Sequence, residues 1–301
     1  MNIVFNTLAT LLVITQALGA SPLPVSLNID SISLNTPTNR SFKLHVGGTP
    51  VFFRIGRSDA DQIGIDRKRE IENLRIGVQL GITPQLLGYE LSNGLLMLEY
   101  IPGTTPTIEE LPPLIDDVVH NFRALHSCKQ NRAVEYTMFD KCYRWRETYN
   151  ALDINKNDQE LVDYWFSAVR SFEKGYYDGE ETGVCHGDIY FGNILVAETG
   201  KVYFIDWEYS LYGYIVDDLG KFCSVLPHEQ DLHKVVKAYW GSEDPQKLLK
   251  LQQNVFLHEL AHYFWCYIQI HNNPNLASAY EQNIQRVSSC LNKMAANFLR
   301  Q

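Results

Sequence analysis

Apolar and polar residues alternate over much of the first third of the chain, and apolar residues recur at helical spacing over much of the rest. Strand-like alternation covers three short stretches, 31–34, 41–46 and 51–55. Gly47-Gly48 indicates a turn between the last two. The run 65–80 has a helical spacing and stops at Gly81. The pattern predicts an antiparallel sheet followed by a helix.

Two further strand-like segments, 85–90 and 95–101, flank the turn sequence Ser92-Asn93-Gly94, which indicates a hairpin. Pro102-Gly103 then breaks the chain. Beyond it, long helical patterns dominate, at 114–127, 158–174, 232–239 and 247–270. The change predicts two lobes: a β-rich lobe at residues 1–101 with one main helix, and a mostly helical lobe at residues 102–301.

A small β-rich island interrupts the helical half. Its predicted strands are 183–188, 194–197 and 202–205, with Glu198-Thr199-Gly200-Lys201 as the turn between the last two. Polar residues fall at the ends of these strands, where short strands can present side chains to a ligand. The island is therefore the first place to look for chemistry.

Composition limits the classes of function. The chain has 301 residues, 45% of them hydrophobic and 20% charged, which predicts a globular protein with a sizeable core. The formal net charge is −9, and Lys and Arg do not gather into a stripe or tail. We therefore expect no nucleic-acid partner and no stable membrane association, and the sequence leaves the oligomeric state open.

Residues 1–20 form an apolar stretch that allows two interpretations. No Lys or Arg precedes it, and Asn6, Thr10 and Gln16 interrupt it, which favours a packing helix. An export signal stays open as the alternative. On the first interpretation, we expect a cytoplasmic protein.

The predicted island carries the residues that phosphoryl transfer requires. Such a reaction needs a group that orients the attacking hydroxyl, and oxygen ligands for Mg²⁺ on the phosphates. The loop His186-Gly187-Asp188-Ile189-Tyr190-Phe191-Gly192-Asn193 matches the template H-R-D-x-x-x-x-N except at its second position, and the hairpin that follows brings in Asp206. We expect Asp188 to be the catalytic base and Asn193 and Asp206 to bind Mg²⁺. The alternative is a pair of carboxylates that solvate loop ends.

The stretches HGDIYFGN and FIDWEYSLYGYIVDDLGKF resemble the aminoglycoside phosphotransferase and choline kinase superfamily. The acid-aromatic-Glu-Tyr run is especially similar to choline and ethanolamine kinases. The resemblance extends from about residue 28 to about residue 273 and is densest between 184 and 222. It implies an α+β, protein-kinase-like fold with a small β-rich lobe, a larger helical lobe and ATP in the cleft between them.

The resemblance also assigns residues to the phosphates of ATP. Arg54 ends a predicted strand at the position where kinases carry a phosphate-binding Lys. Its expected partner is Glu70, rather than Glu72, on the next helix. A solvated helix face is the alternative for this charged run.

Two more segments are similar to nucleotide-binding parts of the family. Thr38-Asn39 ends the segment that corresponds to the phosphate-covering loop, although this chain lacks the glycines of that loop. The main chain of Glu99 and Ile101 is expected to bind the adenine edge. An ordinary polar turn and a core strand are the respective alternatives.

The acceptor is expected to be a small cationic alcohol, with choline first. A quaternary ammonium group cannot donate hydrogen bonds, and aromatic faces with a carboxylate hold it best. By resemblance, Trp207, Glu208, Tyr212 and Trp265 would surround it, and Ile268 replaces the family's second Trp. An aromatic stripe on a helix is also typical of core packing.

Three other functions are alternatives to a choline kinase. A kinase for another small acceptor, namely ethanolamine, thiamine or an aminoglycoside, is the nearest rival. An inactive pseudokinase is less favoured because Asp188, Asn193 and Asp206 are all present. The sequence His258-Glu259-Leu260-Ala261-His262 has zinc-protease spacing, but no third ligand is indicated, so we reject a zinc hydrolase.

Overall fold

The computed structural model describes residues 29–35, 39–46, 48–56, 64–152 and 158–300. Its contacts divide the chain into two compact units: unit 1 comprises residues 1–104 and 195–209, and unit 2 comprises residues 105–194 and 210–301. The helix or export signal considered for residues 1–20, and Thr38, lie outside the described residues. Among the helices that are described, none has the length and apolar character needed to cross a membrane.

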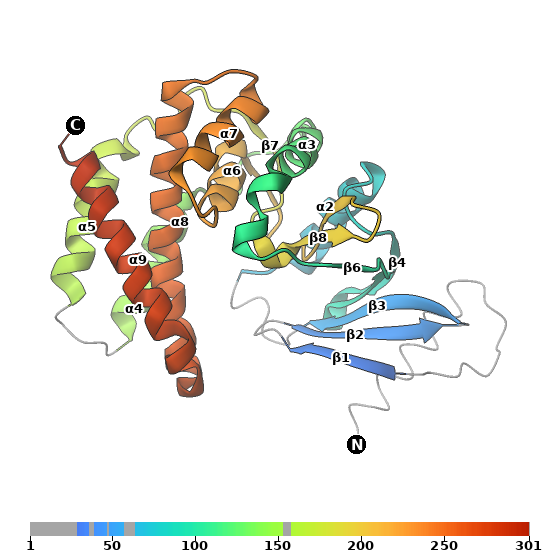
Figure 1. The fold of residues 1–301 in the computed structure, drawn as a ribbon. Helices are drawn as coiled ribbons and strands as arrows, with labels where there is room; N and C mark the ends of the chain where they lie inside the picture. Colours follow the sequence, from blue (N-terminus) through green and yellow to red (C-terminus); the bar gives the residue numbers. More distant parts are fainter. Residues whose placement is uncertain (1–28, 36–38, 47, 57–63, 153–157, 301) are drawn as a thin grey trace. The chain divides into compact units, whose positions relative to one another are not determined.

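Unit 1 is built on a five-stranded antiparallel sheet (Figure 1). Its strands are β1 (Ile29–Asn35), β2 (Asn39–Val46), β3 (Thr49–Gly56), β4 (Leu86–Glu90) and β5 (Leu95–Glu99). Their order is β1-β2-β3-β5-β4. The five strands expected from the alternating pattern are therefore confirmed, and the 3₁₀ turn η2 (Leu91–Asn93) makes the predicted connection between β4 and β5.

The alternation places one face of this sheet in a core. Leu44, Val51, Phe53, Leu95 and Met97 form a buried cluster, in which Phe53 on β3 is paired with Met97 on β5. Helix α2 (Arg67–Gln79) is capped by Asp66, whose side chain accepts hydrogen bonds from the backbone N–H groups of Lys68 and Arg69. The predicted helix is thus confirmed.

A second, three-stranded sheet of unit 1 contains the predicted hairpin. Its order is β6 (Gly103–Thr104), β8 (Ile194–Ala197) and β9 (Val202–Phe204). Gly200 turns the hairpin with φ 85°, and the backbone N–H of Phe204 donates to the carbonyl of Ile82 after α2 (2.7 Å). These contacts bring 195–209 into unit 1. The predicted lobe boundary between residues 101 and 102 did not include this return of the chain to unit 1. The boundary itself stays a prediction.

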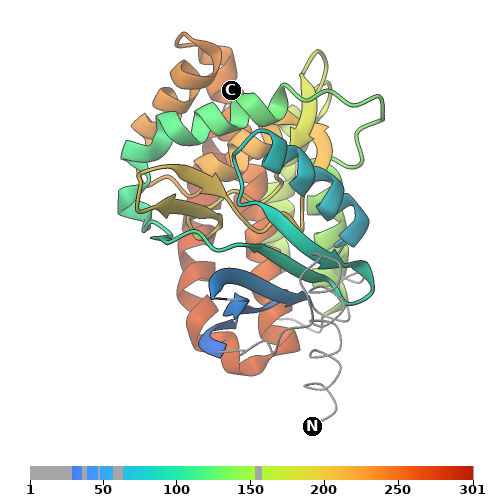
Figure 2. The ribbon, with the colours of Figure 1, turned by 90° about the vertical axis from the view of Figure 1, so that its right-hand side faces the viewer.

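Unit 2 is mostly helical. Its helices are α3 (Ile115–His126), α4 (Met138–Ala151), α5 (Gln159–Glu173), α6 (Ile215–Cys223), α7 (Glu229–Trp240), α8 (Pro245–Asn272) and α9 (Ala277–Phe298). The long helix α8 packs against α4, α6 and α9, and α8 and α9 can be followed in orange and red in Figure 2. The four predicted helices correspond to α3, α5, α7 and α8, while α4, α6 and α9 were not predicted.

One short antiparallel pair completes unit 2: β7 (Thr182–Cys185) with β10 (Leu211–Tyr214). The strand predicted at 183–188 therefore pairs with β10 and not with the hairpin. A small β-rich unit and a larger helical unit confirm the predicted α+β, kinase-like class.

Candidate active site

The loop that follows β7 is held by one buried carboxylate. Asp218, in the first turn of α6, accepts a hydrogen bond from the backbone N–H of His186 at Oδ2 and from that of Gly187 at Oδ1, each at 2.7 Å. Gly187 has φ 80°, a conformation that favours glycine. Asp218 thereby fixes the backbone immediately before Asp188.

Asp188 and Asn193 are brought together at the two ends of this loop. The Nδ2 of Asn193 donates to Asp188 Oδ2 (3.2 Å) and to the Asp188 carbonyl (2.9 Å). The other carboxylate oxygen, Oδ1, lies 3.1 Å from the Nζ of Lys221. Asn193 is buried at the end of the 3₁₀ turn η6 (Phe191–Asn193). The predicted base and one predicted metal ligand therefore share a defined geometry.

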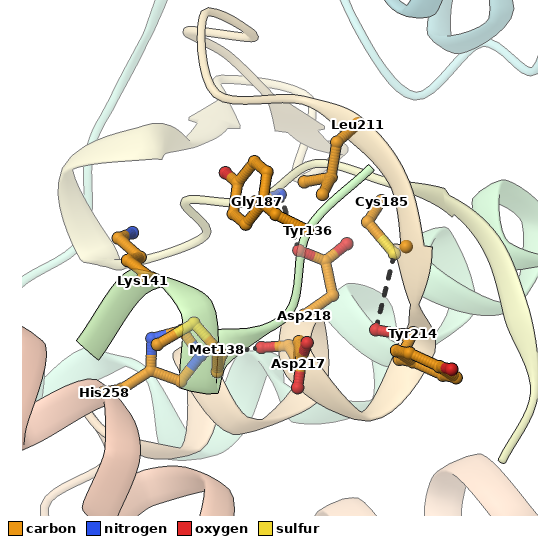
Figure 3. A pocket seen from close by; sticks show the side chains of 11 residues that line it. Tyr136, Met138, Lys141, Cys185, Gly187, Leu211, Tyr214, Asp217, Asp218 and His258 are labelled. Atoms are coloured by element: carbon orange, nitrogen blue, oxygen red, sulfur yellow. Dashed lines mark hydrogen bonds between the residues drawn. The ribbon is translucent and has the colours of Figure 1, made fainter. Parts of the chain in front are cut away.

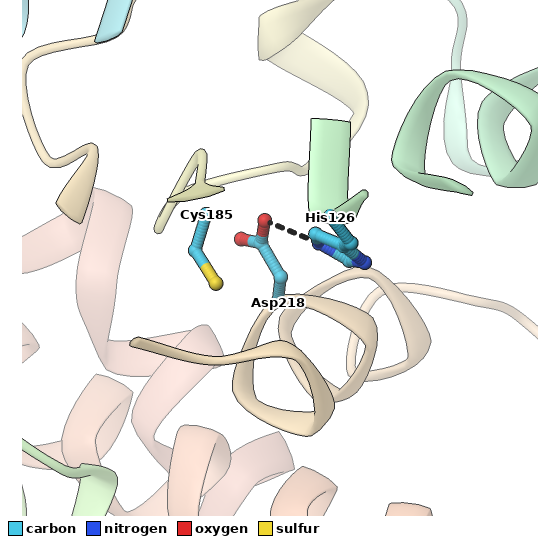
Figure 4. Close-up of side chains that lie close together, drawn as sticks. All are labelled: His126, Cys185 and Asp218. Atoms are coloured by element: carbon cyan, nitrogen blue, oxygen red, sulfur yellow. Dashed lines mark hydrogen bonds and ion pairs between the residues drawn. The ribbon is translucent and has the colours of Figure 1, made fainter. Parts of the chain in front are cut away.

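His126, Cys185 and Asp218 are close enough to hold a metal ion, with ligand atoms within 4.8 Å of one another (Figure 4). Their chemistry argues against a metal site. Both oxygens of Asp218 accept backbone hydrogen bonds, and Oδ2 also accepts from His126 Nε2 (3.1 Å). Burial raises the pKa of the Cys185 thiol well above its usual value, and the charges of Asp218 and Asp217 add to this effect. Because both oxygens of Asp218 are already engaged in these hydrogen bonds, we interpret His126 and Asp218 as a brace for the catalytic loop.

A small cavity of about 20 Å³ lies beside the loop, lined among others by Gly187, Asp217 and His258 (Figure 3). Its volume suits about one water molecule. Asp217 accepts hydrogen bonds from the hydroxyl of Tyr177 (2.9 Å) and from Asn254 Nδ2 (2.6 Å). Burial raises the pKa of Asp217 to about 7, against the effect of these hydrogen bonds, and the charge of Asp218 raises it further.

The raised pKa of Asp217 predicts a pH-dependent stability. The folded protein keeps the Asp217 proton up to about pH 7, whereas the unfolded chain releases it near pH 3.8, so the stability of the wild-type protein falls as the pH rises between these values. We expect the melting temperature of Asp217→Asn, relative to wild type, to rise by a few degrees between pH 5 and pH 8. Asp116→Asn, at an exposed position, is the control. A constant difference would contradict the prediction.

Unit 1 carries a buried ion-pair network around Arg54. The guanidinium of Arg54 lies 2.7 Å from Glu70 Oε1 and 3.3 Å from Asp206 Oδ1. Burial lowers the pKa of Arg54, but Glu70, Asp206 and Glu208 more than offset this effect, so the net pKa is raised. The expected ion pair with Glu70 is present, and the role of Arg54 toward a phosphate stays a prediction.

Asp206, a member of this network, has an unusual backbone conformation. Its φ of 63° is the one positive value at a non-glycine position among the residues that the structure describes. Such a conformation costs on the order of 1 kcal/mol for a residue with a Cβ and concentrates at functional sites. The side chain of Asp206 is 29% exposed, which leaves it accessible to a ligand.

Glu208 and Trp207 are buried within unit 1 rather than open to an acceptor. Oε2 of Glu208 accepts hydrogen bonds from Asn39 (3.0 Å) and Arg67 (3.4 Å), and its side chain is 2% exposed. The indole N–H of Trp207 donates to Thr83 (3.1 Å), and its ring lies against Gly77 of α2. Asn39, which is expected to contact phosphate, donates its side-chain hydrogen bond to Glu208 instead. In this structure, these side chains already have partners in unit 1.

Of the two acceptor residues predicted in unit 2, Trp265 is the more accessible. Tyr212 is buried on β10, where its hydroxyl lies 3.1 Å from that of Thr182 and its ring faces Arg132. Trp265 on α8 is only partly buried.

Two rings, those of His262 and Tyr280, lie against Trp265. Its ring stacks on His262 (centroids 5.8 Å apart) and meets Tyr280 of α9 edge to face (5.3 Å). Burial, followed by the charges of Lys221 and Arg286, lowers the pKa of His262 to about 4. His262 is therefore neutral at pH 7.

The remaining predicted nucleotide residues lie at the end of β5. The N–H of Glu99 donates to the carbonyl of Gln85 (2.9 Å), which leaves the Glu99 carbonyl as the group that could meet adenine. Ile101 follows in the segment before β6 and is partly buried. Their contact with adenine stays a prediction.

The side chains of the zinc-protease-like sequence have other partners. His258 Nε2 is hydrogen-bonded to the Asp217 carbonyl (2.9 Å), and His262 Nε2 lies 3.6 Å from the Cys266 thiol. Glu259 pairs with Arg286 through two contacts of 3.3 Å. In a zinc protease the two histidines would bind the metal and the glutamate would be the general base, whereas here each of the three side chains contacts a protein group.

Three residues of α6 were not assigned roles by sequence reasoning: Asp217, Asp218 and Lys221. All three lie in the quoted stretch FIDWEYSLYGYIVDDLGKF. The available signal was two consecutive carboxylates followed three residues later by a lysine, a spacing that places Asp218 and Lys221 on the same face of a helix. Recognising it required the prediction of α6.

The two units and the Asp188–Asn193 loop define a kinase-like phosphotransferase. Residues 38–250 match the sequence model of the phosphotransferase enzyme family, so the chain belongs to that family. It is a phosphotransferase with an alcohol group as acceptor.

Three similar proteins illustrate this relationship. Probable choline kinase 2 of Arabidopsis thaliana is 25% identical over 78% of this chain and 68% of its own length. Ethanolamine kinase 1 of Homo sapiens is 25% identical over 76% of this chain and 58% of its own length. The crystal structure of choline kinase LicA from Streptococcus pneumoniae has a TM-score of 0.71 at 21% identity, covering 93% of this chain and 98% of that one. The similarity supports a small-alcohol kinase that uses ATP.

Proposed function

We propose that this protein is an ATP- and Mg²⁺-dependent kinase that phosphorylates the hydroxyl of a small cationic alcohol, with choline the first candidate. The observation that carries the proposal is the fixed pairing of Asp188 with Asn193 in a loop clamped by Asp218. The names of the related proteins favour choline and, second, ethanolamine as the acceptor. Because the reaction consumes ATP, we also propose a cytoplasmic location.

In the proposed mechanism, Asp188 orients the acceptor hydroxyl and accepts its proton. Its carboxylate is held by Asn193 and Lys221, which limits the rotamers available to it. A fixed base gains rate because the reacting atoms are already aligned when the substrate binds. Arg54, held by Glu70, would contact the phosphates as a bidentate donor.

The residues predicted to bind Mg²⁺ have the right chemistry for it. Mg²⁺ prefers hard oxygen ligands and is usually held by one or two protein groups together with phosphates. Asp206 offers a partly exposed carboxylate, and Asn193 offers an amide oxygen, since the atom that it uses to bind Asp188 is its Nδ2. When bound, Mg²⁺ would neutralise charge on the phosphates.

The first experiment is to measure ADP release by the purified wild-type protein with ATP, Mg²⁺ and a panel of alcohols. The panel contains choline, ethanolamine, thiamine and an aminoglycoside. We expect the highest kcat/KM for choline. A much higher value for another alcohol would replace choline but keep the kinase, and no turnover with any of them would contradict the proposed function.

Trp265 provides the test of the cationic acceptor. A ring that faces a methylated ammonium contributes roughly 0.5–2 kcal/mol, so we expect Trp265→Ala to raise KM for choline by about two- to thirtyfold with KM for ATP unchanged. Trp240→Ala is the matched control, because Trp240 is also a partly buried Trp of unit 2 and packs on Tyr239. An equal KM for choline in the two variants would remove Trp265 from the acceptor site.

A further inference from the structure

Lys221 is a cation in direct contact with the proposed catalytic base. Its Nζ is 3.1 Å from Asp188 Oδ1 and 5.6 Å from the centre of the Tyr190 ring, and its side chain is 23% exposed. It lies one helical turn after Asp218, so α6 presents Asp218 to the backbone of the loop and Lys221 to its carboxylate. The placement of Lys221 is therefore built into the helix that braces the loop.

The catalytic loop itself supplies no positive charge. The four residues between Asp188 and Asn193 are Ile, Tyr, Phe and Gly. Burial and the charge of Lys221 lower the pKa of His258 and His262, so these neighbouring rings are neutral near pH 7. Phosphoryl transfer, in contrast, spreads negative charge over the oxygens of the transferred group, and positioned cations stabilise that charge.

The contact of Lys221 with Asp188 puts its ammonium close to the place where the acceptor hydroxyl is expected to react. A base lies about 2.6–3.2 Å from the hydroxyl that it deprotonates, and the reacting atoms approach to about 3–3.5 Å. The transferred phosphorus therefore lies within roughly 7 Å of the Asp188 carboxylate. A lysine ammonium has three donors, so Lys221 can keep one contact with Asp188 while donating to a phosphoryl oxygen.

We propose that Lys221 is a catalytic residue that contacts the γ-phosphoryl group during transfer. The inference rests on the proposed function and extends it. The acceptor oxygen forms a bond to the γ-phosphorus while the bond from that phosphorus to the β–γ bridging oxygen breaks, and its electron pair leaves with ADP. The hydroxyl proton passes to Asp188. Lys221 donates hydrogen bonds to the transferred group and stabilises its charge.

The test separates transition-state stabilisation from ground-state binding. We expect Lys221→Met to lower kcat by about 10²- to 10³-fold with KM for ATP within about threefold of wild type, and Lys221→Arg to recover most of the loss. Calorimetry then compares the binding of ADP with Mg²⁺ in the presence and absence of aluminium fluoride, a mimic of the transferred phosphoryl group. Lys221→Met should lose most of the added affinity and keep the affinity for ADP alone. Lys129→Met, which breaks an exposed pair with Glu181, is the control.

The same calorimetry in an Asp188→Asn background distinguishes direct from indirect action. If Lys221 contacts the phosphoryl group, Lys221→Met weakens aluminium fluoride binding in this background too. If Lys221 only positions Asp188, the effect disappears and the inference is overturned, as it is if affinity for ADP alone falls equally. Lys221→Gln, of similar polarity, is the second variant, and unfolding of both Met and Gln variants would assign Lys221 a structural role instead. The alcohol panel is run first on the wild-type protein. A wild-type protein that phosphorylates no alcohol would contradict the proposed function, whereas the variants test only the role of Lys221.

Discussion

Asp188→Asn should lower kcat by about two to four orders of magnitude and leave the affinity for ATP nearly unchanged. This is the usual contribution of a positioned acid–base group. Asn is nearly isosteric with Asp, so it keeps the loop geometry, but it cannot accept the proton of the acceptor hydroxyl. The contacts of Asp188 with Asn193 and Lys221 make this side chain the base favoured by the structure. Initial rates and calorimetric ATP titrations on the same preparation provide the measurement.

Asp178→Asn is the matched control, because Asp178 is an exposed carboxylate of unit 2 in the turn after α5. It should leave kcat unchanged. Turnover of Asp188→Asn within about threefold of wild type would contradict the assignment of the base. A parallel loss of ATP binding would instead indicate that Asp188 organises the nucleotide site.

Strands β2 and β3 of unit 1 were predictable because alternate apolar residues of each strand are buried. Alternation in 41–46 and 51–55 places Leu44, Val51 and Phe53 in one cluster, and the Ser92-Asn93-Gly94 sequence marks the turn to β5. Helices α4 and α6 are harder to predict from spacing. α4 is rich in polar and charged residues, and α6 has nine residues and follows β10 directly. Short or polar elements depend on tertiary packing for their stability.

The loop residues of the candidate site could be predicted because the loop is contiguous. Asp188 and Asn193 are five positions apart, so one motif locates both. Lys221 and Asp218 act on that loop from 25 to 35 positions away, and only the tertiary structure brings them there. The ion pair of Arg54 with Glu70 was the exception, since a family position suggested it before the fold did.

The aromatic residues show where pattern alone is ambiguous. Trp207 and Trp265 both follow motifs of the acceptor site, yet Trp207 is 1% exposed and packs against α2, while Trp265 is partly open. A Trp with an apolar ring and one N–H donor suits either a core or a ligand cage. Trp207 suits a core position, because Thr83 accepts a hydrogen bond from its indole N–H.

Asp206→Ala should abolish Mg²⁺-dependent nucleotide binding, with a loss in affinity above about 100-fold. Even residues that act on a metal indirectly, through its ligands, contribute 10- to 100-fold, and Asp206 is proposed as a direct ligand. The substitution also removes one of the two carboxylates that hold Arg54, which would then depend on Glu70 alone in this ion-pair network. Calorimetric titration of ATP, once with Mg²⁺ and once with a chelator, measures the Mg²⁺-dependent part.

Strain at position 206 has to be separated from loss of the ligand. Ala at a φ of 63° is strained, whereas Gly adopts this conformation freely, so Asp206→Gly removes the carboxylate without the backbone penalty. We expect both variants to lose Mg²⁺-dependent ATP binding equally, and Asn193→Ala to lose less because an amide is a neutral ligand. If Asp206→Gly bound ATP with Mg²⁺ as tightly as wild type does, the loss in Asp206→Ala would come from strain, and the metal role of Asp206 would have to be withdrawn.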